Sequence, residues 1–196
     1  MKSTALAKAM ALAAAVTVLL AAKARHITPV VELVKQVAVI RQTLPDATQF
    51  FVRDVTIGKE DLQKIKQIGD YVPDDPDVRF FVGKNARGEV VGVVLFPQTN
   101  TAQHGPVEVG VTIGPTGKVT KAVVTKATVE TKPWVLEVIK SGFLGSFEGV
   151  PAAAPVDLTP KIDHARLSSM PVYMGTVINR GVNQGLVLYH VLFSSN

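Results

Sequence analysis

Two glycine-containing turns, each between two apolar segments of strand length, constrain the fold of this chain more than any other feature. The turns are Asn85–Gly88 and Gly114–Gly117, and the segments around them are Arg79–Gly83, Glu89–Phe96, Val107–Ile113 and Lys118–Val129. Glycine adopts the positive φ angles that tight hairpin turns require. In the last segment valine alternates with threonine and lysine, which is typical of a sheet with one solvated face. The sequence therefore predicts two β-hairpins and an antiparallel sheet.

Apolar residues at helical spacing predict helices beside this sheet. Leu62, Ile65 and Ile68 indicate a short helix, and Pro133 suits the first turn of another helix that runs to about residue 141. A final helix is expected to begin at Ser168 or Ser169, although its three glycines at positions 175, 181 and 185 weaken it. The apolar chain end Leu188–Phe193 could be helix or strand. Residues 71–77, 97–105 and 150–160 are expected to be loops. The predicted fold class is α+β, a small antiparallel sheet flanked by helices.

The segment before the domain predicts an amphipathic connecting helix within residues 26–44. Thr28 and Pro29 suit the N-cap and the first helical position, and Val30, Leu33, Val34 and Val37 follow at helical spacing. The apolar face of this helix must pack on its own domain or on a partner subunit. The domain itself is expected to occupy residues 45–196.

Residues 1–25 have the character of a secretory signal that is retained as a membrane anchor. Lys2 and Lys8 form a basic start, residues 9–22 are uncharged and mostly apolar, and Lys23 weakens the small-residue cleavage site. If the lysines reach the head groups, residues 4–22 approach the length that a bilayer requires. We therefore expect one transmembrane helix that contacts lipid, a cytoplasmic N-terminus in the inner membrane, and a domain in the periplasm.

Composition excludes several classes of function. The chain has no cysteine, so it carries no disulfide, thiolate metal site or covalent haem. Its four histidines, His26, His104, His164 and His190, lack metal-ligand spacing, and no metal site is expected. His104 is expected to be a solvated loop residue, or else an axial ligand to a haem in a neighbouring subunit. The net charge of +5 without a basic and aromatic stripe predicts no nucleic-acid partner.

Three motifs carry a resemblance to a known family. They are Glu130-Thr131-Lys132-Pro133, the run Phe143–Gly149 with its two phenylalanines and final glycine, and the loop Ile162–Ser169. In this order they resemble the FMN-binding domain of the periplasmic flavoprotein subunits of the Rnf and Na⁺-pumping quinone reductase complexes. The resemblance covers roughly residues 42–191 and implies the same α+β architecture. It also favours a helix at the chain end, because the family ends in one. In that family a small hydroxyl residue in the loop holds the flavin phosphate covalently.

The resemblance also implies that this chain holds no covalent flavin. When the loop is aligned on Ala165, Arg166 stands where the family has the acceptor hydroxyl, and Asp163 and His164 replace its serine and glycine. A non-covalent FMN remains chemically possible, because Arg166 and the N–H groups at the Ser168 or Ser169 helix start are suited to a phosphate. Such a flavin would contact the cofactor-binding candidates Ala165, Arg166, Ser168, Ser169, Glu130, Thr131 and Trp134. Trp134 would then stack on the flavin ring; otherwise it is a core residue.

Two functions follow from the resemblance. The first is a membrane-anchored periplasmic accessory subunit of a respiratory or photosynthetic electron-transfer complex, with other subunits and possibly a cytochrome as partners. The second is a periplasmic flavoprotein whose non-covalent FMN relays single electrons to a cytochrome or quinone reductase. No catalytic residue is expected, so the chain is not predicted to be an enzyme by itself. The connecting helix and the apolar end Leu186–Phe193 are the expected docking surfaces.

Overall fold

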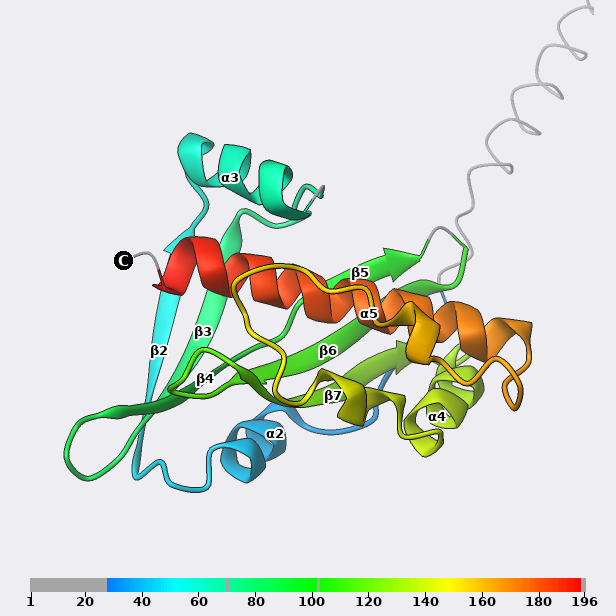
Figure 1. Cartoon of the computed structure of the whole chain (residues 1–196), viewed down its shortest axis with the longest axis horizontal. Helices are drawn as coiled ribbons and strands as arrows, with labels where there is room; N and C mark the ends of the chain where they lie inside the picture. The colour runs from blue at the N-terminus through cyan, green and yellow to red at the C-terminus, as the bar shows by residue number, and fades with distance from the viewer. Residues whose placement is uncertain (1–27, 70, 102, 195–196) are drawn as a thin grey trace, which may run out of the picture.

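A computed structural model describes residues 28–69, 71–101 and 103–194 (Figure 1). The predicted anchor at residues 1–25, with its lipid-contacting stretch, lies outside these described residues. Within them, no helix is long and apolar enough to cross a membrane. The fold is α+β with an antiparallel sheet and helices on both of its faces, as the hairpin and helix patterns predict.

Within the described residues the sheet has seven strands, and every strand pair is antiparallel. Along the sheet the order is β1-β7-β6-β4-β3-β2, and β5 pairs with β6 beyond the end of β4. The strands are β1 Val30–Glu32, β2 Gln49–Thr56, β3 Asp77–Lys84, β4 Val90–Leu95, β5 Gln98–Thr101, β6 Gly105–Ile113 and β7 Val119–Thr128. Both predicted hairpins, β3–β4 and β6–β7, are confirmed, and glycines at positive φ (Gly88 and Gly117) complete their turns.

Helices cover the two faces unequally. They are α2 Gln36–Thr43, α3 Lys59–Gly69, α4 Lys132–Lys140 and α5 Ser169–Tyr189, with short 3₁₀ turns at Phe143–Phe147 and Thr159–Lys161 and a π-helical end at His190–Ser194. Val93 and Val94 are neighbours in β4 and so point to opposite faces. Val93 belongs to the large core that includes α5, and Val94 belongs to a smaller core with Val39 and Ile40 of α2.

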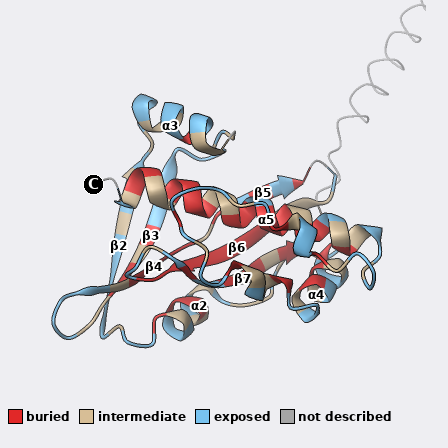
Figure 2. Ribbon diagram, in the orientation of Figure 1, coloured by how far each residue is buried: buried red, intermediate tan, exposed pale blue. Residues whose placement is uncertain are grey.

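The long helix α5 is the main cover of the sheet, and Figure 2 shows its buried side against buried β6. A Cβ atom added at Gly181 would lie 3.2 Å from the Val109 side chain, and one at Gly185 would lie 3.1 Å from the Val111 side chain. Two of the glycines that weaken α5 as an isolated helix, Gly181 and Gly185, therefore allow it to approach β6 closely. Burial of the apolar residues of α5 outweighs the helix-propensity cost of the glycines, which is about 1 kcal/mol each.

The prediction of a connecting helix is wrong for the first half of that segment. Val30–Glu32 form edge strand β1 on β7, and the helix begins only at Gln36. The N–H groups of Leu33 and Val34 both donate to the Thr125 carbonyl, at 2.8 and 3.3 Å, so the chain remains on the sheet up to that point. Strand pairing satisfies backbone groups that a short helix would leave exposed, and β-branched valine favours it.

Two further expectations are corrected. The apolar end Leu186–Phe193 is helical as expected, but it is no docking surface, because residues 186–188, 191 and 192 are buried in the domain's own core. The expected loop at 97–105 contains strand β5, which is hydrogen-bonded to β6. The polar sequence of this segment gives no strand signal. The outer strand β2 was not anticipated from the sequence.

Candidate functional site

The loop expected to hold a flavin phosphate lies on the surface. Ala165, Arg166, Ser168 and Ser169 are all exposed, and the Arg166 side chain retains 87% of its accessible area. Its guanidinium Nε lies 3.5 Å from a carboxylate oxygen of Asp163, within the same turn. Ser168 occupies the N-cap position of α5, but its hydroxyl makes no capping hydrogen bond. Arg166 thus pairs with a neighbouring residue in its own loop.

The second group of predicted residues surrounds the start of α4. Thr131 is fully buried, and its hydroxyl lies 2.9 Å from that of Thr128. The N–H of Thr131 donates to the Thr128 hydroxyl, and the N–H of Thr128 donates to the Thr131 hydroxyl, at 3.2 and 3.1 Å. These bonds fix the turn between β7 and α4. They also commit the Thr131 hydroxyl to its own backbone, so it is not directed toward a ligand.

His104, from the turn between β5 and β6, joins this group. Its Nδ1 lies 3.0 Å from a Glu130 carboxylate oxygen, and its ring meets the Trp134 ring edge-on with centroids 5.5 Å apart. The Tyr173 ring of α5 also meets the His104 ring edge-on, with centroids 6.4 Å apart. The Thr128 hydroxyl donates to the His104 carbonyl, which holds the turn in place. His104 is therefore a half-buried, hydrogen-bonded residue, and the expectation of a solvated loop histidine is wrong.

The predicted site residues are thus brought together only in part. Glu130 and Trp134 both contact His104, and Tyr173, one turn after Ser169, ties α5 to them. Among the described residues, no hydrogen bond, ion pair or ring contact joins Arg166 to this cluster. Trp134 packs against the main core, which agrees with its interpretation as a core residue. The role of His104 was missed because its partners come from distant parts of the chain.

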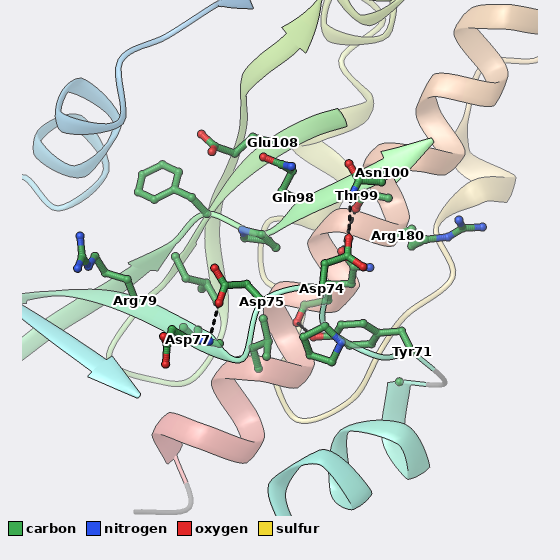
Figure 3. A pocket seen from close by; sticks show the side chains of 18 of the residues that line it. Tyr71, Asp74, Asp75, Asp77, Arg79, Gln98, Thr99, Asn100, Glu108 and Arg180 are labelled. Atoms are coloured by element: carbon green, nitrogen blue, oxygen red, sulfur yellow. Dashed lines mark hydrogen bonds between the residues drawn. The ribbon is translucent and has the colours of Figure 1, made fainter. Parts of the chain in front are cut away.

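Sequence reasoning also missed a polar cleft of about 1190 Å³ on another side of the domain. Figure 3 shows it between the segment that enters β3, strand β5 and helix α5. Its polar lining includes Tyr71, Asp74, Asp75, Asp77, Arg79, Gln98, Asn100, Glu108, Arg180 and Gln184. None of the predicted flavin-binding residues lines it.

The cleft exists because the sheet splits between β3 and β5. Strand β4 pairs with β3 only along residues 81–84, and Phe96 and Pro97 separate it from β5. In the β2–β3 and β5–β6 ladders, alternate residues are hydrogen-bonded to the paired strand. The bonds from Ile57 N–H to Pro76 O and from Val109 N–H to Pro97 O show which residues these are. The backbone groups of residue 79 on β3 and residues 98 and 100 on β5 then point away from their paired strands, toward the split. Asn100 closes one end by donating to Asp74 at 2.6 Å.

Charge in the cleft is predominantly acidic. Five carboxylates, those of Asp54, Asp74, Asp75, Asp77 and Glu108, face two guanidinium groups, those of Arg79 and Arg180. Arg79 is already bound to Asp54 at 2.7 and 3.0 Å, and this hydrogen bond lowers the pKa of the Asp54 carboxyl. Such a surface repels a phosphate dianion and suits neutral polar or cationic groups. No cluster of potential metal ligands occurs within the described part of the chain.

Two polar groups, the buried Glu108 carboxylate and the hydroxyl of half-buried Tyr71, lie in the walls of this cleft. The Glu108 carboxylate accepts hydrogen bonds from Gln36, Thr125 and Lys126, all between 2.7 and 2.9 Å. The Tyr71 hydroxyl donates to the Gln184 carbonyl at 3.3 Å, and burial raises the pKa of Tyr71 well above its usual value. Both groups are satisfied by the protein itself, so they are structural parts of the wall.

Comparisons with known proteins add no family. Neither a protein-family model nor a curated protein matches this sequence. The α+β antiparallel fold is therefore the extent of the classification that structure supports, and function rests on the residues described above.

Proposed function

We propose that this chain is a membrane-anchored periplasmic accessory subunit of an electron-transfer membrane complex, with an FMN-binding-like domain that carries no covalent flavin. The observation that carries the proposal is Arg166. It occupies the position that the resemblance assigns to the flavin acceptor, it has no hydroxyl for a phosphoester, and its guanidinium is exposed and paired with Asp163. The chain then contributes binding surfaces to the complex, while other subunits carry the redox centres.

The contacts around Trp134 support this proposal. In the family that this chain resembles, the turn that corresponds to Glu130–Pro133 lies beside the flavin ring. Here the His104 imidazole meets the Trp134 indole and engages the Glu130 carboxylate, and the Thr131 hydroxyl is bound to Thr128. The Glu130 carboxylate, the Thr131 hydroxyl and the Trp134 ring, which a bound flavin would contact, are thus already engaged by other groups of the protein. The acidic cleft offers no alternative place for a phosphate.

Exposed apolar residues support a role in a complex. Val37 retains 55% of its accessible area, and Val30 is also exposed. Both lie in the short stretch that leads from the N-terminal segment into the domain. A partner at the membrane surface would bury them and gain about 25 cal/mol for each Å² of apolar area. Leu33 and Val34, by contrast, pack on the domain itself, so docking through the predicted helix face is confined to its exposed residues.

The competing function is a flavoprotein with non-covalent FMN. Two observations favour it: the Arg166 guanidinium is exposed enough to bind a phosphate, and the Tyr173 ring is exposed beside His104. In that case the flavin phosphate would bind at the start of α5 and the ring would displace or stack on this aromatic group. The two functions differ in one measurable property, the flavin content of the purified protein.

The test is to purify the full chain from membranes in mild detergent and measure flavin in two ways. A denaturing gel under ultraviolet light reports covalent flavin, and the fluorescence of an acid extract reports non-covalent flavin. We expect neither signal. A fluorescent band that disappears in Ser168→Ala would place the acceptor two residues later and contradict the proposal. Stoichiometric flavin in the extract that is lost in Arg166→Ala would establish the competing function instead.

The membrane and complex parts of the proposal need separate measurements. Intact-mass analysis should find the N-terminal residues 1–25 retained, and alkaline washing should leave the chain in the membrane fraction. On a native gel of mildly solubilised membranes, the chain should migrate with a larger oxidoreductase complex, and Val37→Asp should weaken this association. A mature chain that starts near Arg25, or migration as a small species only, would count against this assignment.

A further inference from the structure

Strand β2 exposes three consecutive large apolar residues. Phe50, Phe51 and Val52 retain 45%, 47% and 55% of their accessible area. In Figure 1, β2 is the outer strand at one end of the sheet, and β3 is its only strand partner in the described chain. Successive strand residues point to opposite faces, so Phe50 and Val52 lie on one face and Phe51 on the other. A partner that covers all three must therefore approach the strand from its edge.

The backbone of β2 is also ready for an additional strand. Ile57 donates its N–H to the Pro76 carbonyl, and the β2–β3 register continues unbroken over residues 49–56. In an antiparallel ladder, residues 49, 51, 53 and 55 then bond to β3, while the N–H and C=O groups of residues 50, 52 and 54 point outward. Proteins usually protect such edges with lysine, proline or a bulge. Residues 49–52 have none of these.

We propose that β2 pairs with β2 of a second copy of this chain. The two strands run antiparallel around a twofold axis at Phe51 and form one continuous sheet across the dimer. In this register Phe51 lies opposite its own counterpart, and Phe50 lies opposite Val52 on both sides of the axis. Gln49 then lies opposite Arg53, so polar residues flank the apolar centre. A twofold interface must be self-complementary, and this segment is.

Charge and apolar matching select this register from its neighbours. Only residues of the same parity can pair, because the outward N–H groups alternate. An axis at Arg53 or at Asp54 would place like charges directly opposite each other, and an axis at Phe50 would leave only residues 49–51 paired, because β2 begins at Gln49. Like charges in direct cross-strand pairs are destabilising. An axis at Val52 avoids this but leaves Phe50 against a carboxylate.

Contacts on β2 itself are compatible with the added strand. The Arg53 guanidinium lies over the Phe193 ring at 5.1 Å and donates to the Leu192 carbonyl, so it covers the domain's own helix end. The Lys84 ammonium lies 5.1 Å from the Phe51 ring centre. In the dimer, the two central rings would pack together with a Lys84 ammonium beside each. The π-helical segment His190–Ser194 therefore covers the strand near Arg53 and leaves residues 50–52 open.

Disulfide trapping tests the register directly, because the chain has no cysteine of its own. Phe51 faces its counterpart in a non-hydrogen-bonded pair, where Cβ atoms approach to about 5 Å or less, within reach of a disulfide. In the full chain, under mild oxidation in membranes, Phe51→Cys should form a dimer efficiently. Phe50→Cys and Val52→Cys should crosslink poorly alone and well when mixed. Val72→Cys, equally exposed but far from β2 in sequence, is the control.

A second measurement does not depend on oxidation. In mild detergent at micromolar concentration the full chain should sediment as a dimer, and Phe51→Lys should weaken dimerisation about tenfold or more. Val72→Lys makes the same change at another exposed site and should have no effect. The proposal is overturned if the wild-type chain is monomeric, if Phe51→Lys dimerises like Val72→Lys, or if Phe51→Cys crosslinks no better than Val72→Cys. Preferential crosslinking of Val52→Cys alone would overturn the register.

Discussion

The imidazole Nδ1 of His104 lies 3.0 Å from a carboxylate oxygen of Glu130, although 26 residues separate them in the chain. The pair links the β5–β6 turn to the turn that follows β7. Because the same imidazole meets the Trp134 ring edge-on, an interaction between two turns also sets the surroundings of the only tryptophan. This part of the domain is therefore open to measurement by fluorescence.

Removal of the His104 ring should destabilise this corner and change tryptophan emission. His104→Ala loses an edge-on aromatic contact and a partly exposed hydrogen bond, which together are worth about 1–2 kcal/mol. We expect this loss in the free energy of unfolding, and a red-shifted Trp134 emission in the folded state. Glu130→Gln keeps a hydrogen-bond acceptor and should change both quantities much less. Unchanged emission in His104→Ala would show that the ring contact is not maintained in solution.

Loss of the buried Glu108 carboxylate should be costly. Glu108→Ala leaves Thr125, Gln36 and Lys126 without their shared acceptor, and we expect a loss of about 2–3 kcal/mol in urea unfolding. Glu148, which pairs with Lys121 at 2.8 Å on the surface, is the matched control. Glu148→Ala should cost about 0.5 kcal/mol or less. Equal effects of the two substitutions would mean that burial of Glu108 contributes nothing.

Alkaline pH should destabilise the domain in part through Tyr71. Burial raises the pKa of its hydroxyl in the folded state, so the folded chain binds the phenolic proton more tightly than the unfolded chain does. The resulting stability is fully present below the unfolded pKa of about 10 and declines as pH rises above it. Tyr71→Phe should flatten the loss of stability above pH 10, at the cost of its hydrogen bond to Gln184. An identical alkaline profile in Tyr71→Phe would contradict the prediction.

Two glycine substitutions should differ sharply. A Cβ atom at Gly92 would lie 2.6 Å from a Leu44 methyl group and 3.0 Å from the Ile113 carbonyl oxygen, so Gly92→Ala forces α2 or the sheet to move. We expect a loss of about 1–3 kcal/mol from this overpacking. A Cβ atom at Gly145 meets no described residue within 4 Å, and Gly145→Ala should leave the urea midpoint nearly unchanged. Similar midpoints for both variants would show that the Leu44 contact relaxes freely.

Local sequence signals determined the two hairpins and most helices. Turn residues such as Gly88 and Gly117 have a conformational requirement that depends on few neighbours, so β3–β4 and β6–β7 were predictable. The periodic apolar residues of α3 and the Pro133 start of α4 were equally informative. The absence of a hydroxyl at Arg166 is likewise a property of the sequence alone.

Tertiary pairing decided the remainder. A helical period fits Val30, Leu33, Val34 and Val37. Val30–Glu32 nevertheless form a strand, because they pair with the edge of β7, about a hundred residues away. The same dependence on distant partners hid the burial of Glu108, the pairing of His104 with Glu130 and the split between β3 and β5. Helical periodicity and turn chemistry act within a few residues, whereas strand edges and buried polar groups are satisfied by whichever segment the fold brings to them. For this reason the sequence determined the elements, and the tertiary structure decided which of their surfaces remain open.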